Sequence, residues 1–268
     1  MPEKDYRFYT MIPILFVLIG LIAALLINSI SNIDYYKIVS KVKTVKTYKI
    51  NKSKDYTTVG WLRVQGTSID YPIIHANSLD VSYPITIEKY VWITSLDGKF
   101  KNYTNIDGHN LYNVGSNIVK HSKKFTRFEE LLDFVYYDFA KENLYFQIST
   151  KDGDYIYKIF AVNLLPISSE YASEDDGYDD KNELKNYIDV LLENSFYDYN
   201  VDVNNTDKIV SLRTCSKLYD KEYSSRDFVV TGRLLRKNEK NDLYSVEKND
   251  KYNDIEKKLN GVDIGYEV

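Results

Sequence analysis

The side chains best suited to covalent chemistry are one cysteine, Cys215, and three histidines, His75, His109 and His121. A lone cysteine has no intramolecular disulfide partner, so it is either a small buried side chain or a reactive group. A reactive thiol needs help at neutral pH, because its ordinary pKa of about 8.5 leaves only a few per cent as thiolate. A nearby histidine can supply the base or the counter-charge.

His109 has the most suitable context of the three histidines. It follows a strand-like run and a turn, Asn-Tyr-Thr-Asn-Ile-Asp-Gly-His-Asn, over residues 102–110. Gly108 permits an unusual backbone conformation there, which would present the imidazole at a strand end. The other two histidines lie in contexts typical of surface or structural roles. If Cys215 is reactive, His109 is the best candidate for its partner; from the residues alone, a buried thiol with His109 at the surface stays open.

An attacked carbonyl also needs a donor for its oxyanion, and a guanidinium stays charged at any relevant pH. Arg226 lies eleven residues after Cys215, at the start of the apolar run 228–235. Two antiparallel strands joined by a loop of that size would bring Arg226 beside the thiol. The cysteine and the scattered histidines lack metal-ligand spacing, and there is no glycine-rich phosphate loop, so we expect no metal and no other cofactor.

These residues need a scaffold, and the chain between 57 and 236 alternates short β-type runs with turn signals. Two segments have helical periodicity instead, 125–139 and 181–196. The pattern predicts a mainly β fold with inserted helices, most simply a closed barrel. The predicted strands are 59–64, 71–75, 90–95, 99–106, 144–150, 155–165, 208–214 and 228–235.

An apolar segment precedes this domain. The twenty residues 8–27 carry no charge, and the uncharged stretch continues to Ile33. Twenty helical residues span about 30 Å, the thickness of a bilayer's hydrocarbon core. The run is longer than the apolar part of a cleaved signal peptide, and no small-residue cleavage site follows it. We predict an uncleaved signal anchor over residues 8–30, with the C-terminal part outside the cell.

The predicted organisation follows from these features. Residues 1–7 are a cytoplasmic N-terminus, 31–56 a lysine-rich linker or juxtamembrane helix, 57–236 the globular domain, and 237–268 a polar, solvated tail. The net charge is only −4, with both signs interspersed, so nothing suggests a nucleic-acid partner.

Several motifs together resemble a known family. Residues 211–215, Ser-Leu-Arg-Thr-Cys, resemble the sortase signature Thr-Leu-x-Thr-Cys, and 108–110, Gly-His-Asn, resemble the residues around the sortase histidine. Residues 59–64 and 66–72 are similar to the family's opening strands. A helix soon after the histidine and a long connection over 166–207 resemble class B. The resemblance covers residues 57–236 and implies an eight-stranded sortase barrel and a cysteine transpeptidase.

The resemblance also implies roles for individual residues. Cys215 would attack the threonine carbonyl of a sorting signal and hold the acyl fragment as a thioester. His109 would protonate the leaving amine and deprotonate the incoming one, while Arg226 would steady the oxyanion. The residues expected to bind substrate are Ser211, Arg213, Thr214, Asp107 and Asn110.

The partners implied by the resemblance are extracellular. They are the sorting-signal peptide of secreted surface proteins, an amine of a peptidoglycan precursor or of a pilin, and the membrane of a Gram-positive bacterium that holds the anchor.

The chain departs from the family pattern in four places. Ser211 replaces a threonine but keeps a hydroxyl. Asp107 stands where a tyrosine often precedes Gly-His, and we expect it to raise the pKa of His109. Asp227 separates Arg226 from the apolar triplet 228–230, and residues 76–106 look shortened.

The third departure concerns the strand face that Arg226 occupies. A shift of one residue reverses the face, so Arg226 would need a bulge or a loop end to reach the thiol. Arg213 and Arg233 are the substitutes for Arg226 as the donor to the oxyanion. Two further functions therefore stay open: an anchored binding or scaffolding protein with a misaligned triad, and a cysteine peptidase that uses water as acceptor.

Overall fold

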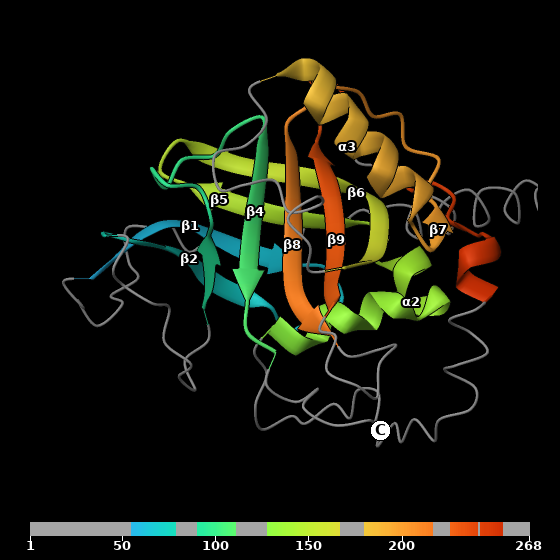
Figure 1. Cartoon of the computed structure of the whole chain (residues 1–268), viewed down its shortest axis with the longest axis horizontal. Helices are drawn as coiled ribbons and strands as arrows, with labels where there is room; N and C mark the ends of the chain where they lie inside the picture. The colour runs from blue at the N-terminus through green and yellow to red at the C-terminus, as the bar shows by residue number, and fades with distance from the viewer. Residues whose placement is uncertain are drawn as a thin grey trace, which may run out of the picture. The chain divides into compact units, whose positions relative to one another are not determined.

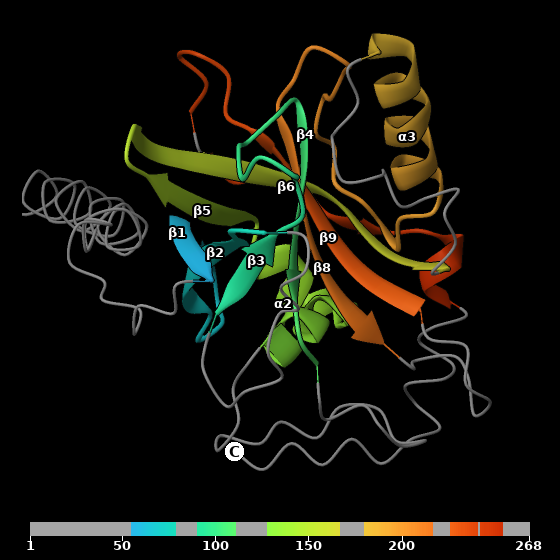
Figure 2. The ribbon, with the colours of Figure 1, turned by 60° about the vertical axis from the view of Figure 1, so that its left-hand side comes forward.

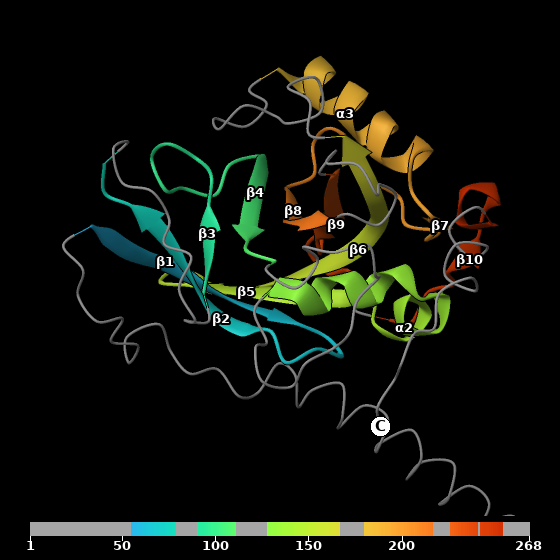
Figure 3. The same ribbon diagram turned by 60° about the horizontal axis from the view of Figure 1, so that its bottom comes forward.

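A computed structural model of the whole chain describes residues 55–78, 90–110, 128–166, 180–216, 226–240 and 242–253, except for the side chains of Pro166 and Arg226. Figures 1, 2 and 3 show these parts as coloured ribbon from three directions.

Eight strands close into a barrel in the order β1-β2-β3-β4-β8-β9-β6-β5. Closure removes the unpaired edges that an open sheet would expose. The predicted mainly β, eight-stranded barrel with few helices is thus confirmed. The strands are β1 Tyr56–Val64, β2 Asp70–Ala76, β3 Val91–Ile93, β4 Tyr103–Gly108, β5 Tyr145–Thr150, β6 Gly153–Pro166, β8 Ile209–Ser216 and β9 Arg226–Leu234.

The strands β4, β8 and β9 are adjacent in this barrel. β4 and β8 run parallel, from Tyr103 beside Ile209 to Gly108 beside Thr214. β8 and β9 run antiparallel, so the C-terminal end of β8 meets the start of β9. The same arrangement is visible in Figure 1, where the arrows of β4 and β8 point to one end of the molecule.

Two short helical segments lie at this end of the barrel. The sequence predicts one helix over 125–139, and the described part instead contains a 3-10 helix, η2 Phe128–Val135, followed by α2 Tyr137–Glu142. The break falls at Tyr136, whose extended backbone (φ −90°, ψ 124°) cannot continue a helix. All eight residues of η2 are buried, so this segment is part of the core.

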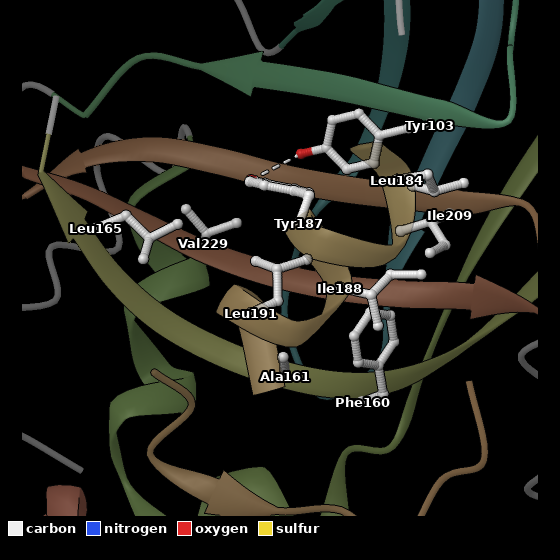
Figure 4. Close-up of a cluster of buried hydrophobic side chains, with 10 residues drawn as sticks. All are labelled: Tyr103, Phe160, Ala161, Leu165, Leu184, Tyr187, Ile188, Leu191, Ile209 and Val229. Atoms are coloured by element: carbon white, nitrogen blue, oxygen red, sulfur yellow. Dashed lines mark hydrogen bonds between the residues drawn. The ribbon is translucent and has the colours of Figure 1, made fainter. Parts of the chain in front are cut away.

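Helix α3, Lys181–Glu193, confirms the second helix prediction. The carboxylate of Asp180 caps it by accepting a hydrogen bond from the backbone N–H of Asn182 (2.6 Å). Its apolar face packs on strands β4, β6, β8 and β9, as Figure 4 shows. The cluster that joins helix and sheet consists of Tyr103, Phe160, Ala161, Leu165, Leu184, Tyr187, Ile188, Leu191, Ile209 and Val229. A helix can cover only the outer surface of a closed barrel, so these strand residues define its outer face.

The segment after β9 is not the solvated tail that the sequence predicts. Strand β10, Glu247–Lys248, pairs with β7, Tyr197–Asp198, and both Val246 and Tyr252 are buried. The Tyr244 hydroxyl contacts the carbonyl oxygens of Leu144 (2.6 Å) and Ile159 (2.7 Å). The prediction is wrong for residues 242–253, because a few aromatic anchors attach a segment that is polar on average. Residues 254–268 lie outside the described residues.

No helix in the described ranges is long and apolar enough to cross a membrane. The predicted anchor over residues 8–30 lies outside those ranges, as does the linker up to residue 54, and both stay predictions.

Candidate active site

Cys215 lies near the C-terminal end of β8 and is exposed. Side chains alternate along a strand, so Cys215 shares the outer face of the barrel with Arg213, Ser211 and Ile209. Ile209 is covered by α3 in the cluster of Figure 4. The row therefore runs from a covered end beneath the helix to an accessible thiol at the other end.

His109 is brought next to this thiol by the parallel pairing of β4 and β8. The last pair of that ladder is Gly108 with Thr214. The next residue after β4 is His109, and the next residue along β8 is Cys215. Two hydrogen bonds hold them there. The Thr214 hydroxyl donates to the carbonyl of Gly108 (2.7 Å), and the Asn110 side-chain amide donates to the carbonyl of Cys215 (2.9 Å).

The glycine before His109 is needed for space. Its φ is not among the positive values found at other described glycines, so the unusual backbone expected there is absent. A Cβ atom on Gly108 would instead lie 2.4 Å from the ring of Phe128 in η2. The buried helical segment and the histidine loop therefore pack closely, and the N–H of Phe128 donates to the carbonyl of His109 (3.4 Å).

Trp92 is a site residue that sequence reasoning did not identify. Its ring centroid lies 4.6 Å from that of His109, with the planes inclined by 52°. Strand β3 places it there, because Trp92 pairs with Asp107, two residues before the histidine. The only signal in the sequence was that Trp92 is one of two tryptophans. Its ring restricts the positions open to the imidazole.

The β8–β9 ladder places an acidic residue opposite the thiol. The register is continuous from Ile209 with Arg233 to Cys215 with Asp227 and Ser216 with Arg226. Directly opposed residues of an antiparallel pair share a face, so Asp227 lies on the face of Cys215. The described backbone here lacks the bulge that Arg226 was expected to need, and the part of Arg226 in catalysis stays a prediction.

Arg213 places a guanidinium on the face of Cys215. Its Nε and Nη2 donate to the two carboxylate oxygens of Asp107 at 2.8 and 2.7 Å. Its Nη1 lies 3.7 Å from Oδ2 of Asp227. Asp107 therefore directs its carboxylate to Arg213, and its expected effect on the pKa of His109 stays a prediction.

The second substitute, Arg233, is engaged elsewhere. It pairs with Ile209 at the far end of β8, and it is buried and bonded to Glu239 at 2.6 and 2.7 Å. Of the two substitutes, only Arg213 shares the end of β8 that carries Cys215.

Two of the residues expected to bind substrate are buried. Ser211 has no exposed surface, and its hydroxyl is 2.8 Å from that of Thr231. Thr214 is 2% exposed and bonded to Gly108. Both side chains therefore stabilise the strands that carry the site rather than contact a substrate. Arg213, Asp107 and Asn110 are the expected binding residues that retain accessible surface.

The charges around the thiol act against its ionisation. Partial burial raises the pKa of Cys215 above its ordinary value, Asp227 and Asp107 raise it further, and Arg213 opposes them. Burial, with help from Asp107, raises the pKa of Asp227 to about 6 despite the opposing effect of Arg213. Burial disfavours the charged form of Arg213, but the two carboxylates outweigh it and raise its pKa. The thiol therefore depends on a base or on a change in these charges to react at neutral pH.

The described residues contain no cluster of histidine, cysteine and carboxylate side chains that could hold a metal ion. The thiol lies on the strand next to the loop that carries His109, an arrangement that suits a thiol nucleophile assisted by an imidazole.

No family model matches the chain. The sortase B of Listeria monocytogenes is 27% identical over 194 residues, which are 70% of this chain and 72% of that protein. The sortase B of Staphylococcus aureus is 22% identical over 189 residues, with the same shares of both chains.

Solved structures give the same relationship. The Clostridium perfringens sortase B matches 69% of this chain and 97% of its own, with a TM-score of 0.55 and 19% identity. The Listeria monocytogenes sortase B matches 68% and 95%, with a TM-score of 0.51 and 25% identity. In sequence and in fold, the chain is a distant relative of the sortase B proteins.

Proposed function

We propose that this chain is a sortase B-like cysteine transpeptidase, anchored in the cell membrane with its barrel outside. It would cleave the sorting signal of secreted proteins and transfer the acyl fragment to an amine. The observation that carries the proposal is the pair of hydrogen bonds, Thr214 to Gly108 and Asn110 to Cys215, that hold the histidine loop beside the cysteine strand.

The proposed reaction begins with the thiol. Cys215 gives its proton to His109 and attacks the carbonyl of the peptide, which forms a tetrahedral intermediate. His109 protonates the leaving amine as the C–N bond breaks and a thioester remains. An incoming amine then attacks the thioester, gives up its proton, and restores the thiol.

A guanidinium is needed at the oxyanion in this scheme. Arg226 is the residue implied by the family pattern, and Arg213 is the alternative supported by its place on the face of Cys215. Nη1 of Arg213 takes no part in the bonds to Asp107, so it is the group that could donate to a substrate carbonyl.

Related proteins support the choice of partners. Their solved structures include a Staphylococcus aureus sortase B–substrate complex and a sortase B complexed with triglycine. By extension, we propose a sorting-signal peptide as acyl donor and a peptidoglycan or pilin amine as acceptor for this chain.

A catalytically impaired binding protein is the second candidate. The observation in its favour is the carboxylate of Asp227 opposite Cys215, where the charge raises the pKa of the thiol. A cysteine peptidase that uses water is the third, and it would share the acylation half of the reaction.

One assay separates the three. The full chain in detergent is incubated with fluorogenic peptides of the NPxTN and PPxTG types, with and without triglycine. A transpeptidase cleaves one of them and forms the triglycine adduct, a peptidase releases only the hydrolysed acid, and a binding protein cleaves neither. Cleavage that persists in Cys215→Ala would refute the nucleophile assignment.

A further inference from the structure

Asp227 is the acidic side chain nearest to Cys215 in the ladder. The two residues are direct partners of an antiparallel pair, and the Cβ atoms of such pairs are about 4.5–5.5 Å apart. Their electrostatic coupling agrees with this placement, because the charge of Asp227 raises the pKa of the thiol. A group bound to the carboxylate of Asp227 would therefore lie next to the sulfur.

Within the described part of the chain, the neighbours of Asp227 neutralise its charge only partly. Arg213 donates two hydrogen bonds to Asp107, whereas its contact with Asp227, at 3.7 Å, is too long for a hydrogen bond. Two carboxylates thus share one guanidinium, and the three side chains carry a net charge of −1 when all are ionised. The carboxylate that Arg213 neutralises less is that of Asp227, which lies opposite Cys215.

The surroundings of Asp227 shield its charge from solvent. Its side chain is 17% exposed, and on β6 its partner is the apolar Leu165. Among the side chains that the structure describes, the charged and titratable groups that act on it are Arg213, Asp107 and Cys215. Its pKa of about 6 leaves the carboxylate ionised at neutral pH, and low local polarity strengthens its attraction for a cation.

A carboxylate at this position cannot stabilise an oxyanion, since like charges repel, but it can bind a cation. The reaction proposed above consumes a primary amine, and such amines are ammonium ions at neutral pH. We propose that Asp227 binds the ammonium group of the acceptor and holds it beside the Cys215 thioester. This inference rests on the proposed function, because only transfer to an amine requires such a group.

The transfer step balances with the groups at hand. The ammonium held by Asp227 gives one proton to His109, which is neutral after it has protonated the leaving amine. The free amine then attacks the thioester carbonyl, a C–N bond forms, and the C–S bond breaks. The second amine proton ends on the sulfur of Cys215, and His109 releases the first to solvent.

The test bypasses the unknown sorting motif. Cys215 is the only cysteine, so S-phenyl thioacetate converts it to a single acetyl thioester in the full chain by displacement of thiophenolate. Loss of this acetyl group is then followed by mass spectrometry against increasing triglycine. Hydroxylamine, which is uncharged at neutral pH, serves as the reference nucleophile in the same preparation.

The expected result is a selective loss in the Asp227→Asn variant. The ratio of the triglycine rate to the hydroxylamine rate falls about 5- to 10-fold, as the loss of one partly buried charge pair predicts. Asp152→Asn, an exposed residue in the turn between β5 and β6, keeps the wild-type ratio.

An unchanged ratio in Asp227→Asn would overturn the inference. It would also be overturned if the wild-type acetyl-enzyme lost its acetyl group to triglycine and to hydroxylamine at the same rate. The proposed function fails in a different way, namely when the wild type cleaves neither peptide. The acetyl-transfer assay still reports on Asp227 in that case.

Discussion

At the scale of single residues, burial raises the pKa of the Cys215 thiol, and three charged side chains from three strands modify it further. Asp107 comes from β4, Arg213 from β8 and Asp227 from β9. Arg213 favours the thiolate and the two carboxylates oppose it. The reactivity of Cys215 therefore depends on how Arg213 is shared between its two acidic neighbours.

Replacing Asp107 tests this sharing. In Asp107→Asn the guanidinium is free to turn to Asp227 and one negative charge is lost, so we expect the pKa of the Cys215 thiol to fall. The rate of alkylation by iodoacetamide as a function of pH measures it directly, because no other thiol is present.

The control is Asp138→Asn, an exposed residue on α2 paired with Lys141. Coincident pH profiles for wild type and Asp107→Asn would contradict the prediction. NMR titration of His109 in the same two proteins tests whether Asp107 also raises the pKa of the imidazole, and identical curves would exclude that effect.

The charge of Asp227 should also reduce the stability of the fold. Its folded pKa of about 6 lies above the unfolded value near 3.9, so the cost is absent below about pH 4 and complete above about pH 6. We expect Asp227→Asn to raise the free energy of unfolding by about 1–3 kcal/mol near pH 7, with no gain near pH 4.

Urea unfolding at the two pH values measures this difference. Asp152→Asn should show no pH-dependent gain relative to wild type. A gain in Asp227→Asn that is equal at both pH values would contradict the linkage.

At the scale of elements, a bulge in β6 lets α3 attach to the barrel. The β6–β9 register shifts between Ile159 and Ala161. The intervening Phe160 packs with α3 together with its neighbour Ala161, as Figure 4 shows, although successive strand residues normally face opposite sides. The bulge therefore widens the apolar surface available to the helix.

The C-terminal segment 242–253 meets β6 at the same bulge. The Tyr244 hydroxyl reaches the carbonyls of Leu144 and Ile159. Farther along, the Asn249 side chain donates to the carbonyl of Ser195, just after α3 (2.7 Å). The segment thus connects the bulged strand to the end of the helix.

Removing one hydroxyl tests the contribution of this segment. Tyr244→Phe leaves the ring in place but removes the hydroxyl that bonds the carbonyls of Leu144 and Ile159, while Leu144 keeps the N–H of Ile159 as donor; we therefore expect a loss of about 1 kcal/mol in the free energy of unfolding. Leu243→Ala is the matched control, because Leu243 is 80% exposed. Equal stability of Tyr244→Phe and wild type in urea would show that the segment is only loosely attached.

At the scale of the whole molecule, the position of the barrel relative to a membrane depends on residues 8–30, which stay a prediction. We expect the full chain to sediment with bacterial membranes and to be released by detergent but not by alkaline carbonate. A chain lacking residues 1–33 should stay in the supernatant, because the apolar run is what partitions into lipid.

The single cysteine also reports on orientation. A membrane-impermeant maleimide should label Cys215 on intact cells that lack an outer membrane, and the Cys215→Ala variant gives the background. Labelling that appears only after lysis would place the barrel on the cytoplasmic side and contradict the predicted topology.

Local pattern was sufficient to predict much of this protein. The eight strands, helix α3 and the pairing of Cys215 with the Gly108–Asn110 loop follow from alternating apolar residues, turn signals and short motifs. Strand and helix positions depend on neighbours in the chain, so the sequence by itself was sufficient to predict them, whereas the pairing of Cys215 with His109 was predicted from motifs that resemble the sortase family.

Tertiary structure alone decided which side chains surround the thiol. Strand register placed Asp227 opposite Cys215, and a contact between strands placed Trp92 on His109. Packing required Gly108 to be small, and a few aromatic contacts attached the polar segment 242–253 to the barrel. The physical reason is that a one-residue shift in register reverses a strand's faces, and the order of residues along a single strand does not specify its register with the next.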